Sequence, residues 1–340
     1  MKNKFTSRDI EVFIPTYNRA RFLTSALESV LAQSAGKVKI TVLDNASDDN
    51  TRELMQDYAK RGVNYYRAQS NSGGFANFKK AQELAEAPYI IYFHDDDIMH
   101  PKYLESILKG LNAFPNIAIA ASMYTWFNNH EGPPKTPAVL KNKYLFSADS
   151  ADMAASLLDD NFTSCVCSAV VRKDAFKAIV LEPEKFGKLN DWPAMINAAA
   201  RGNFFILTDK NAISCRVHPA RDSNDEATGI TALQLKNWFD FFFRLLIQKR
   251  TLFFIKEMSR VILIQYREFV SSGQKKEVPF DAFFDMLYSD KNKPVLRYIN
   301  KAHIFRRRSL FYRVLSRPIK WGARSYLGKY VASPSAPFSL

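Results

Sequence analysis

The first half of this 340-residue chain alternates short apolar runs with segments of helical period, and this rhythm limits the folds open to it. The apolar runs occupy residues 10–14, 38–43, 63–67 and 89–94, and helical patterns follow them over residues 20–33, 51–60, 77–85 and 101–113. Repeated strand–helix units of this kind feed a mostly parallel sheet with helices on its faces. The sequence therefore predicts an α/β fold.

The pattern continues to about residue 235 and then changes. Further strands are predicted over residues 117–123, 163–172 and 203–208, and a helix over 192–201. The proline-containing segment 128–147 is expected to be a surface loop, and long loops often act as lids or specificity elements. Aromatic-rich helical patterns then cover residues 236–270 and 297–330. We therefore predict an α/β domain over residues 1–235 and a helical, basic C-terminal region over residues 236–340.

The formal net charge of +14 resides entirely in the C-terminal region. Residues 236–340 hold 21 Lys and Arg against 7 Asp and Glu, whereas residues 1–235 hold 27 of each. Aromatic and basic residues interleave over residues 304–313, which favours an amphipathic helix on an anionic membrane surface, with about 1 kcal/mol from each nearby basic residue. The alternatives are a nucleic-acid partner and a solvated face of a helical bundle.

The three cysteines are expected to be buried free thiols in a reducing compartment. Cys165 and Cys167 are one residue apart in a predicted strand, and Cys215 lies far along the chain, so we expect neither a disulfide framework nor a metal cluster. The polar N-terminus precedes an apolar run of only about five residues, far short of a signal-peptide core or a membrane span. We therefore expect a cytoplasmic protein.

Polar residues follow each of the first four predicted strands. Ligands of open parallel sheets bind beyond the carboxyl ends of the strands, so side chains at these positions are expected to meet. Each segment alone is typical of turns and helix caps, but their joint placement predicts a ligand site. The segments contain Pro15, Thr16, Tyr17, Asn18 and Arg19; Asp44 and Asn45; Gly74 and Asn77; and His94, Asp95, Asp96 and Asp97.

In this order these segments resemble family 2 glycosyltransferases, over roughly residues 8–222. That family has a strand ending in Pro-Thr-Tyr-Asn, a second strand ending in Asp before a Ser/Asp-rich turn, and an acidic cluster about fifty residues later. The resemblance implies a GT-A fold, with a Rossmann-like, mostly parallel sheet flanked by helices. It also implies transfer of a sugar, with inversion, from a nucleotide sugar to a hydroxyl of a glycan or lipid-linked saccharide, as in bacterial polysaccharide and lipopolysaccharide synthesis.

The resemblance assigns the nucleotide to the segments after the first three strands. The Asp44 carboxylate would accept a hydrogen bond from an imide N–H, which favours UDP or dTDP over a purine donor. The alternative for Asp44 is a turn residue that caps the helix beginning at Thr51. The implied nucleotide-binding residues are Pro15, Thr16, Tyr17, Asn18, Arg19, Asp44, Asn45, Gly74, Asn77 and Asp95, the last near the ribose.

The acidic cluster predicts a site for Mn²⁺ or Mg²⁺. Consecutive carboxylates repel one another, whereas hard divalent cations bind carboxylate and phosphate oxygens together. The resemblance places the metal on Asp96, while a literal Asp-X-Asp pattern would select Asp95 and Asp97. Acids in the first turn of a helix opening near Pro101 are the alternative for Asp97, which we retain as a second metal candidate. His218 is the third, because many relatives carry a histidine near the metal at this position.

The inverting reaction requires a general base that removes the proton of the acceptor hydroxyl. The family supplies an acidic residue that opens a helix, and Asp191 occupies that place here, with Asn190 where a Glu is common. The alternative is that Asp191 caps the helix ahead of Pro193, and both roles are compatible. Arg216 and Arg221 are candidates to neutralise the leaving diphosphate.

Two other functions remain open at this point. A nucleic-acid-binding protein would use the basic C-terminal region, but the charge balance of residues 1–235 makes nucleic acid an unlikely partner of that part. A nucleotidyltransferase of related architecture would normally carry a basic, Gly-rich phosphate loop after the first strand, and residues 15–18 are not one. The resemblance implies a nucleotide sugar and a saccharide or lipid-linked acceptor as partners, and with the basic C-terminal region it implies a peripheral enzyme on the inner face of the membrane.

Overall fold

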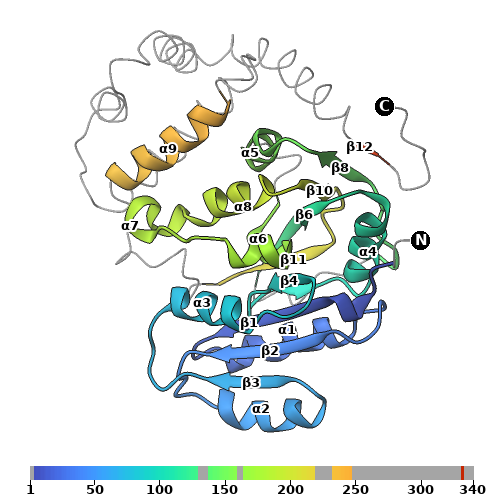
Figure 1. The fold of residues 1–340 in the computed structure, drawn as a ribbon. Coiled ribbons are helices and arrows are strands. Elements are labelled where there is room, and N and C mark those ends of the chain that lie inside the picture. Colours follow the sequence, from blue (N-terminus) through green and yellow to red (C-terminus); the bar gives the residue numbers. More distant parts are fainter. Residues whose placement is uncertain (1–3, 129–136, 159–163, 219–231, 247–330, 333–340) are drawn as a thin grey trace.

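The computed structural model describes residues 4–128, 137–158, 164–218, 232–246 and 331–332 (Figure 1). After a short 3₁₀ turn, η1 (Ser7–Asp9), its N-terminal half forms the parallel part of a nine-stranded sheet. The strands are β1 (Ile10–Thr16), β2 (Lys39–Asp44), β3 (Asn64–Arg67) and β4 (Tyr89–Tyr92), in the order β4-β1-β2-β3. The helices α1 (Ala20–Leu31), α2 (Thr51–Lys60) and α3 (Gly74–Leu84) connect them, which confirms the predicted α/β fold.

The other half of the sheet is mixed. β9 (Val170–Arg172) runs antiparallel between β4 and β6 (Ile117–Ser122), and β10 (Asn203–Leu207) is parallel to β6. β8 (Tyr144–Ser147) and β12 (Val331–Ala332) continue the sheet antiparallel. A second sheet has the order β5-β11-β7, from β5 (Ile98–Met99), β11 (Ile213–Val217) and β7 (Tyr124–Asn128). Since β5 directly follows the acidic cluster, this small sheet brings β11 to the same place.

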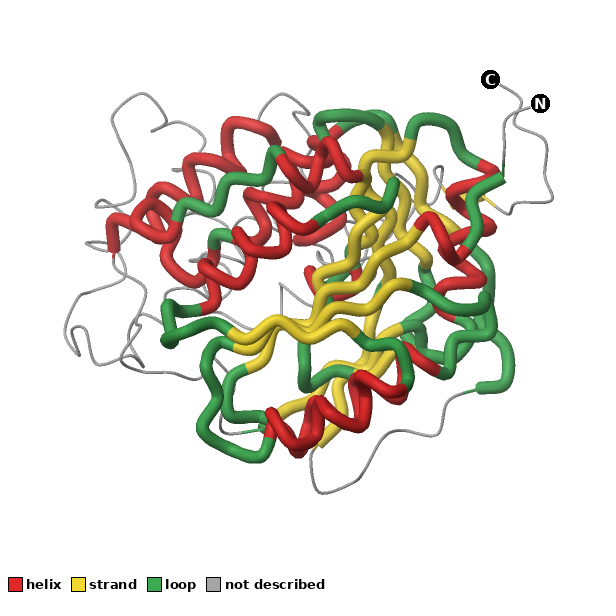
Figure 2. The backbone as a smooth tube through the Cα atoms, turned by 60° about the horizontal axis from the view of Figure 1, so that its bottom comes forward, coloured by secondary structure: helices red, strands yellow, loops and turns green. Residues whose placement is uncertain are grey.

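Helices cover both faces of the large sheet (Figure 2). Residues of α1, α2 and α4 (Tyr103–Ala113) pack in one hydrophobic core, and residues of α3, α5 (Ser150–Leu158), α6 (Lys173–Lys177) and α8 (Asp191–Ala199) pack in the other. Side chains alternate between the faces of a strand. Accordingly Val12 and Ile14 of β1 enter the first core, whereas Phe13 enters the second.

Two predicted segments differ from the structure. The strand predicted over residues 163–172 is confined to β9, because residues Val166–Ser168 form a 3₁₀ turn, η2. The Ser168 hydroxyl donates to the Cys165 carbonyl at 2.7 Å within this turn, so Cys165 and Cys167 lie at a bend and not on one face of a strand. The predicted loop 128–147 contains β8, which pairs with β10; residues 129–136 lie outside the described part of the chain.

The C-terminal part of the described chain joins the main core. The short elements α7 (Pro183–Phe186) and η3 (Gly187–Leu189) precede α8, and α9 (Ala232–Leu246) packs against α7 with Trp238 and Phe242 buried. The predicted boundary after residue 235 falls within α9. Because residues 247–330 lie outside the described ranges, the two-part division and the membrane-binding helices stay predictions.

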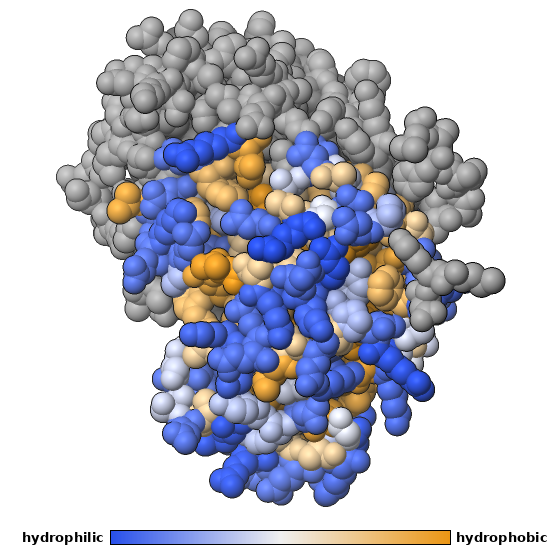
Figure 3. Space-filling model, viewed as in Figure 1, coloured by the Kyte–Doolittle hydropathy of each residue, from blue (hydrophilic) through white to orange (hydrophobic). Residues whose placement is uncertain are grey.

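The described surface is predominantly polar in the view of Figure 3, with hydrophobic residues gathered in separate patches. Within the described ranges, every helix is too short or too polar to span a bilayer. Exposed large apolar side chains include Trp126 and Phe75, at 51% and 47% exposure. Scattered residues of this kind are normal on protein surfaces.

Gly110 provides a test of how closely α4 packs on the sheet. A Cβ atom at this position would lie 2.4 Å from Cζ of the buried Phe205 ring. A Gly→Ala substitution within a helix normally raises the free energy of unfolding by up to about 1 kcal/mol, but overpacking a core lowers it by about 1–3 kcal/mol. We expect Gly110→Ala to lower the free energy of unfolding by about 1–2 kcal/mol in urea denaturation. Gly74→Ala, where a Cβ meets nothing within 4 Å, is the control, and equal stability of both variants would contradict this packing.

Candidate active site

The loops after β1 and β2 are bonded to each other. The strand register pairs Thr16 with Asp44, so both loops start at one edge of the sheet. Asn18 has a φ of 53°, which Asn tolerates better than most residues. Its backbone N–H donates to Ser47 Oγ at 2.9 Å, and its Oδ1 accepts from the Asp48 N–H at 2.7 Å. The predicted nucleotide-binding segments are thus held in one unit.

Asp44 lies fully buried at the base of this unit. Its Oδ1 accepts from the N–H and hydroxyl of Ser47 at 2.9 and 2.6 Å. Its Oδ2 accepts from the Tyr65 hydroxyl at 2.5 Å and lies 3.4 Å from Arg67 Nε. Burial and the Asp44 carboxylate together raise the pKa of Tyr65. Asp49 accepts from the Thr51 N–H at 3.0 Å, so the alternative that Asp44 caps α2 was wrong.

The segment after β3 is held against the end of β2. Asn45 donates to Asn71 Oδ1 at 2.6 Å and accepts from the Ser72 N–H at 3.0 Å. Asn77 donates to the Leu43 carbonyl at 2.9 Å. Gly74 begins α3 beside them. These bonds fix the loop beside Asp44; contact of Asn45, Gly74 and Asn77 with a nucleotide stays a prediction.

Asp95 and Asp96 face basic groups from distant segments. Arg19 Nη1 lies 3.3 Å from Asp95 Oδ1 and 3.9 Å from Asp96 Oδ2, and His218 Nε2 lies 2.9 Å from the same Asp96 oxygen. All three of Asp95, Asp96 and His218 are buried. Burial raises the pKa of Asp95 to about 7, which Arg19 opposes and the Asp96 charge supports.

The donor set of Asp96 and His218 fits a divalent cation. A carboxylate oxygen and an imidazole nitrogen suit Mn²⁺, and oxygen ligands suit Mg²⁺. Two ligand atoms that each lie about 2.1 Å from a metal, with an angle of about 90° between the two bonds, are about 3 Å apart. Asp96 Oδ2 and His218 Nε2 are 2.9 Å apart. Two residues that are 122 positions apart in sequence thus converge with the spacing of a coordination pair.

Asp97 faces a different set of partners. Its Oδ1 accepts from the Arg216 N–H at 3.0 Å, and its Oδ2 lies 3.6 Å from His94 Nδ1. Burial raises the pKa of Asp97, but His94, Cys167 and the Arg216 N–H together outweigh burial and lower it. The carboxylate therefore points toward β11 and His94, so the structure groups Asp96 with His218 and leaves Asp97 apart from that pair.

Arg216 fastens β11 to the acidic segment. Its Nε donates to the Asp96 carbonyl at 2.9 Å, and its guanidinium carbon lies 5.1 and 4.6 Å from the ring centroids of Phe22 and Phe127. Burial lowers the pKa of Arg216. This packing shows a positioning role, and contact with a diphosphate stays a prediction. Arg221 lies outside the described ranges.

Asp191 is the first residue of α8 and lies within electrostatic reach of His94. Its Oδ1 accepts from the Trp192 N–H at 2.9 Å. Burial raises the pKa of Asp191 to about 6, and the Trp192 bond and the His94 charge oppose the rise. Asn190 occupies the N-cap position, so the alternative that Asp191 is the capping residue was wrong.

Comparison with known proteins identifies the family. The sequence pattern of glycosyl transferase family 2 matches residues 11–180, which is half of the chain. The chain belongs to glycosyl transferase family 2. This family 2 enzyme is 22% identical over 224 residues to an uncharacterised glycosyltransferase of Rickettsia typhi, covering 66% of the chain and 69% of the relative. It is 24% identical over 249 residues to the minor teichoic acid biosynthesis protein GgaB of Bacillus subtilis, covering 71% of the chain but 26% of that relative.

Solved structures support the GT-A fold of this glycosyltransferase. The crystal structure of Staphylococcus aureus TarS 1–349 in complex with UDP-GlcNAc matches with a TM-score of 0.60 and 15% identity, covering 86% of this chain and 87% of TarS 1–349. The corresponding complex with UDP matches with a TM-score of 0.52 and 18% identity, at the same coverage. Family membership thus favours the glycosyltransferase interpretation over a nucleic-acid-binding protein or a nucleotidyltransferase.

Sequence reasoning missed Tyr65 and Arg67, which hold Asp44. Both side chains point to the end of β2 because β3 pairs Val42 with Tyr65 and Asp44 with Arg67. Their alternation along a short strand was visible in the sequence, but the strand register was not. The sequence places His94 among the polar residues after the fourth strand but gives it no role. Its contact with Asp97 and its charge effect on Asp191 come from the structure.

The bond between Tyr65 and Asp44 can be tested by stability. We expect Tyr65→Phe to lower the free energy of unfolding by about 1–3 kcal/mol, because a buried carboxylate loses a hydrogen-bond donor. Tyr66→Phe is the matched control, since the neighbouring Tyr66 is 38% exposed. Both would be compared by urea denaturation. A Tyr65→Phe variant as stable as Tyr66→Phe would show that Asp44 does not depend on this hydroxyl.

Proposed function

We propose that this glycosyltransferase transfers a sugar from a UDP-sugar or dTDP-sugar to a hydroxyl of a saccharide or lipid-linked acceptor. The transfer inverts the anomeric configuration and depends on a divalent metal. The observation that carries this proposal is the convergence of Asp96 and His218 to 2.9 Å beside Arg19, next to the carboxyl ends of β1, β2 and β4. Ligands of open α/β sheets bind at such an edge. The fold neighbour TarS, crystallised with UDP-GlcNAc, supports a uridine donor.

Asp44 is proposed to select the base of the donor. Each carboxylate oxygen can accept two hydrogen bonds. Ser47 donates two to Oδ1 and Tyr65 donates one to Oδ2, so an imide N–H would take the remaining position on Oδ2, which Arg67 Nε approaches to 3.4 Å. Uracil and thymine present such an N–H as a donor flanked by carbonyls. The residues that hold Asp44 would keep its oxygens in place without cost at the moment of binding.

Asp96 and His218 are proposed to hold Mn²⁺ or Mg²⁺ with the donor diphosphate. A cation bound there would stabilise negative charge on the departing diphosphate. Arg19 lies near enough to both Asp95 and Asp96 to move between them and a phosphate oxygen. Arg216 keeps β11, and with it His218, against the acidic segment.

Asp191 is proposed to act as the general base. A pKa of about 6 lets it be ionised near neutral pH yet accept a proton more readily than an ordinary aspartate. Its bond from the Trp192 N–H fixes one oxygen and leaves the other for the acceptor hydroxyl. The proton of that hydroxyl would pass to Asp191 as its oxygen attacks the anomeric carbon.

The acceptor is proposed to be a cell-surface polymer or its lipid-linked precursor. Relatives include GgaB and a teichuronic acid biosynthesis glycosyltransferase of Bacillus subtilis, which is 29% identical over 102 residues. Lipopolysaccharide remains the other acceptor class that the sequence suggested. Such acceptors are assembled at the inner face of the membrane, where the basic residues 291–340 would bind anionic lipid.

The metal–nucleotide site is tested by calorimetric titration of UDP, dTDP and GDP with and without Mn²⁺. We expect Mn²⁺-dependent binding of UDP or dTDP, and Asp96→Asn to weaken it at least about tenfold, because removing one ligand charge weakens metal binding. Asp57→Asn, at an exposed side chain of α2, should bind as the wild type does. Absence of nucleotide binding under every condition would rule out the proposed donor site.

The general base is tested by the pH dependence of transfer or of donor hydrolysis. Since Asp191 must be ionised, we expect kcat/KM to fall about tenfold per pH unit below about 6. Asp191→Asn should lower kcat by about 100- to 10,000-fold and leave UDP affinity unchanged. A variant that retains wild-type kcat, or an acid limb near the ordinary aspartate pKa, would assign the base to another residue.

A further inference from the structure

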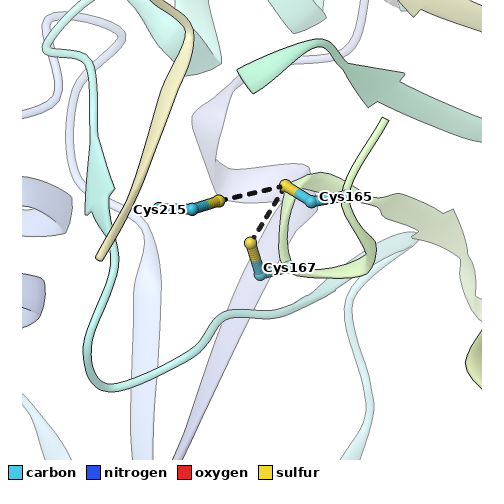
Figure 4. Close-up of side chains that lie close together, drawn as sticks. All are labelled: Cys165, Cys167 and Cys215. Atoms are coloured by element: carbon cyan, nitrogen blue, oxygen red, sulfur yellow. Dashed lines mark hydrogen bonds between the residues drawn. The ribbon is translucent and has the colours of Figure 1, made fainter. Parts of the chain in front are cut away.

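Two thiols that are close in sequence, Cys165 and Cys167, and the distant thiol of Cys215 converge in the fold (Figure 4). Cys165 and Cys167 lie on either side of the first residue of η2, and their sulfur atoms are 3.1 Å apart. Cys215 approaches from β11, with its sulfur 3.7 Å from that of Cys165. All three sulfur atoms lie within 4.8 Å of one another. The 3₁₀ turn allows this close approach, because residues two positions apart in an extended strand lie about 6–7 Å apart.

The spacing of the sulfur atoms matches a metal site. A point equidistant from three atoms so spaced lies about 2.0–2.4 Å from each, which brackets the Zn–S bond of about 2.3 Å. Tetrahedral geometry with that bond places sulfurs about 3.8 Å apart, close to the separation of Cys165 and Cys215. A disulfide requires about 2.05 Å, which neither measured separation approaches.

Candidates for a fourth ligand lie beside Cys167. Asp97 and His94 offer ligand atoms that lie within 4.8 Å of Cys167 Sγ and of each other. One Asp97 oxygen accepts from the Arg216 N–H, and the other, 3.6 Å from His94 Nδ1, is the one that would bind the metal. Cys167 and Cys215 are 1% and 3% exposed and Cys165 is partly exposed, so a bound ion would be largely shielded from water. Structural zinc sites are commonly closed and four-coordinate in this way.

We propose that Cys165, Cys167 and Cys215 bind a thiophilic divalent cation, Zn²⁺, with the Asp97 carboxylate in the fourth position. Each thiol gives its proton to solvent as the thiolate binds. This site differs in chemistry from the pair of Asp96 and His218, because sulfur ligands select zinc and exclude Mn²⁺ and Mg²⁺. It does not rest on the proposed nucleotide chemistry.

The bound ion fastens β11 to the floor of the candidate active site. Cys215 directly precedes Arg216, whose N–H and guanidinium hold Asp97 and the Asp96 carbonyl. His218 follows two residues later and faces Asp96. A zinc ion on Cys215 and on the η2 cysteines would therefore fix the strand that carries His218.

The test is titration of the reduced, chelator-treated full chain with Cd²⁺, followed by the ultraviolet thiolate-to-metal charge-transfer band. We expect saturation at one Cd²⁺ per chain, displacement of the band by Zn²⁺, and no displacement by Mn²⁺. Cys165→Ser, Cys167→Ser and Cys215→Ser should each weaken binding at least about tenfold. Asp96→Asn should keep the band, so that failure of the nucleotide site and failure of the zinc site are distinguished.

Two results would overturn the proposal. One is the absence of a thiolate band in the reduced protein, or a band that all three serine variants retain. The other is an intact mass two hydrogen atoms lower after purification without reductant, with no zinc bound, since this would indicate a disulfide. If a serine variant fails to fold, the wild-type Tm decides: Zn²⁺ should raise it and a chelator should reverse the rise, whereas an unchanged Tm contradicts the site.

Discussion

Three consecutive carboxylates, Asp95, Asp96 and Asp97, are buried together at the end of β4, and much of the surrounding structure serves to hold them. Like charges removed from water are costly unless each is paired. Each carboxylate here has its own basic partner: Arg19 for Asp95, His218 for Asp96 and His94 for Asp97. These partners come from the β1 loop, the end of β11 and the end of β4, so the acidic segment ties distant parts of the chain together.

The packing around the carboxylates explains why the small sheet exists. β5 continues directly from Asp97 and pairs with β11, and Arg216 of β11 bonds back to the backbone of Asp96 and the side chain of Asp97. Phe22 of α1 lies against both Arg216 and His218. A shift of β11 would therefore separate His218 from Asp96 and expose the Arg216 guanidinium. The proposed zinc site on the other side of Cys215 would oppose the same shift.

Much of this arrangement could be predicted from the sequence. The strand–helix rhythm gave the parallel half of the sheet, and the ends of β1, β2 and β4 hold the expected polar residues. The strand predicted over residues 163–172 includes β9, but its antiparallel direction and the η2 turn before it were missed. A Val-rich run is compatible with either a strand or a turn, and here the Ser168 hydroxyl bonds to the turn backbone. The contacts of Tyr65 and Arg67 with Asp44 depend on the register of β2 and β3, which local sequence patterns do not reveal. The thiol cluster likewise depends on a contact between residues 50 positions apart. The N-cap position fell on Asn190 and not on Asp191, within the usual error of helix ends.

The most direct measurement is a crystal structure of the protein with UDP and Mn²⁺, with anomalous diffraction recorded to locate manganese. The account predicts one manganese peak within coordination distance of Asp96 Oδ2 and His218 Nε2, bridged to the diphosphate, with the uracil beside Asp44. UDP bound with its diphosphate away from this pair, or manganese on other ligands while Asp96 and His218 remain bonded to each other, would contradict it.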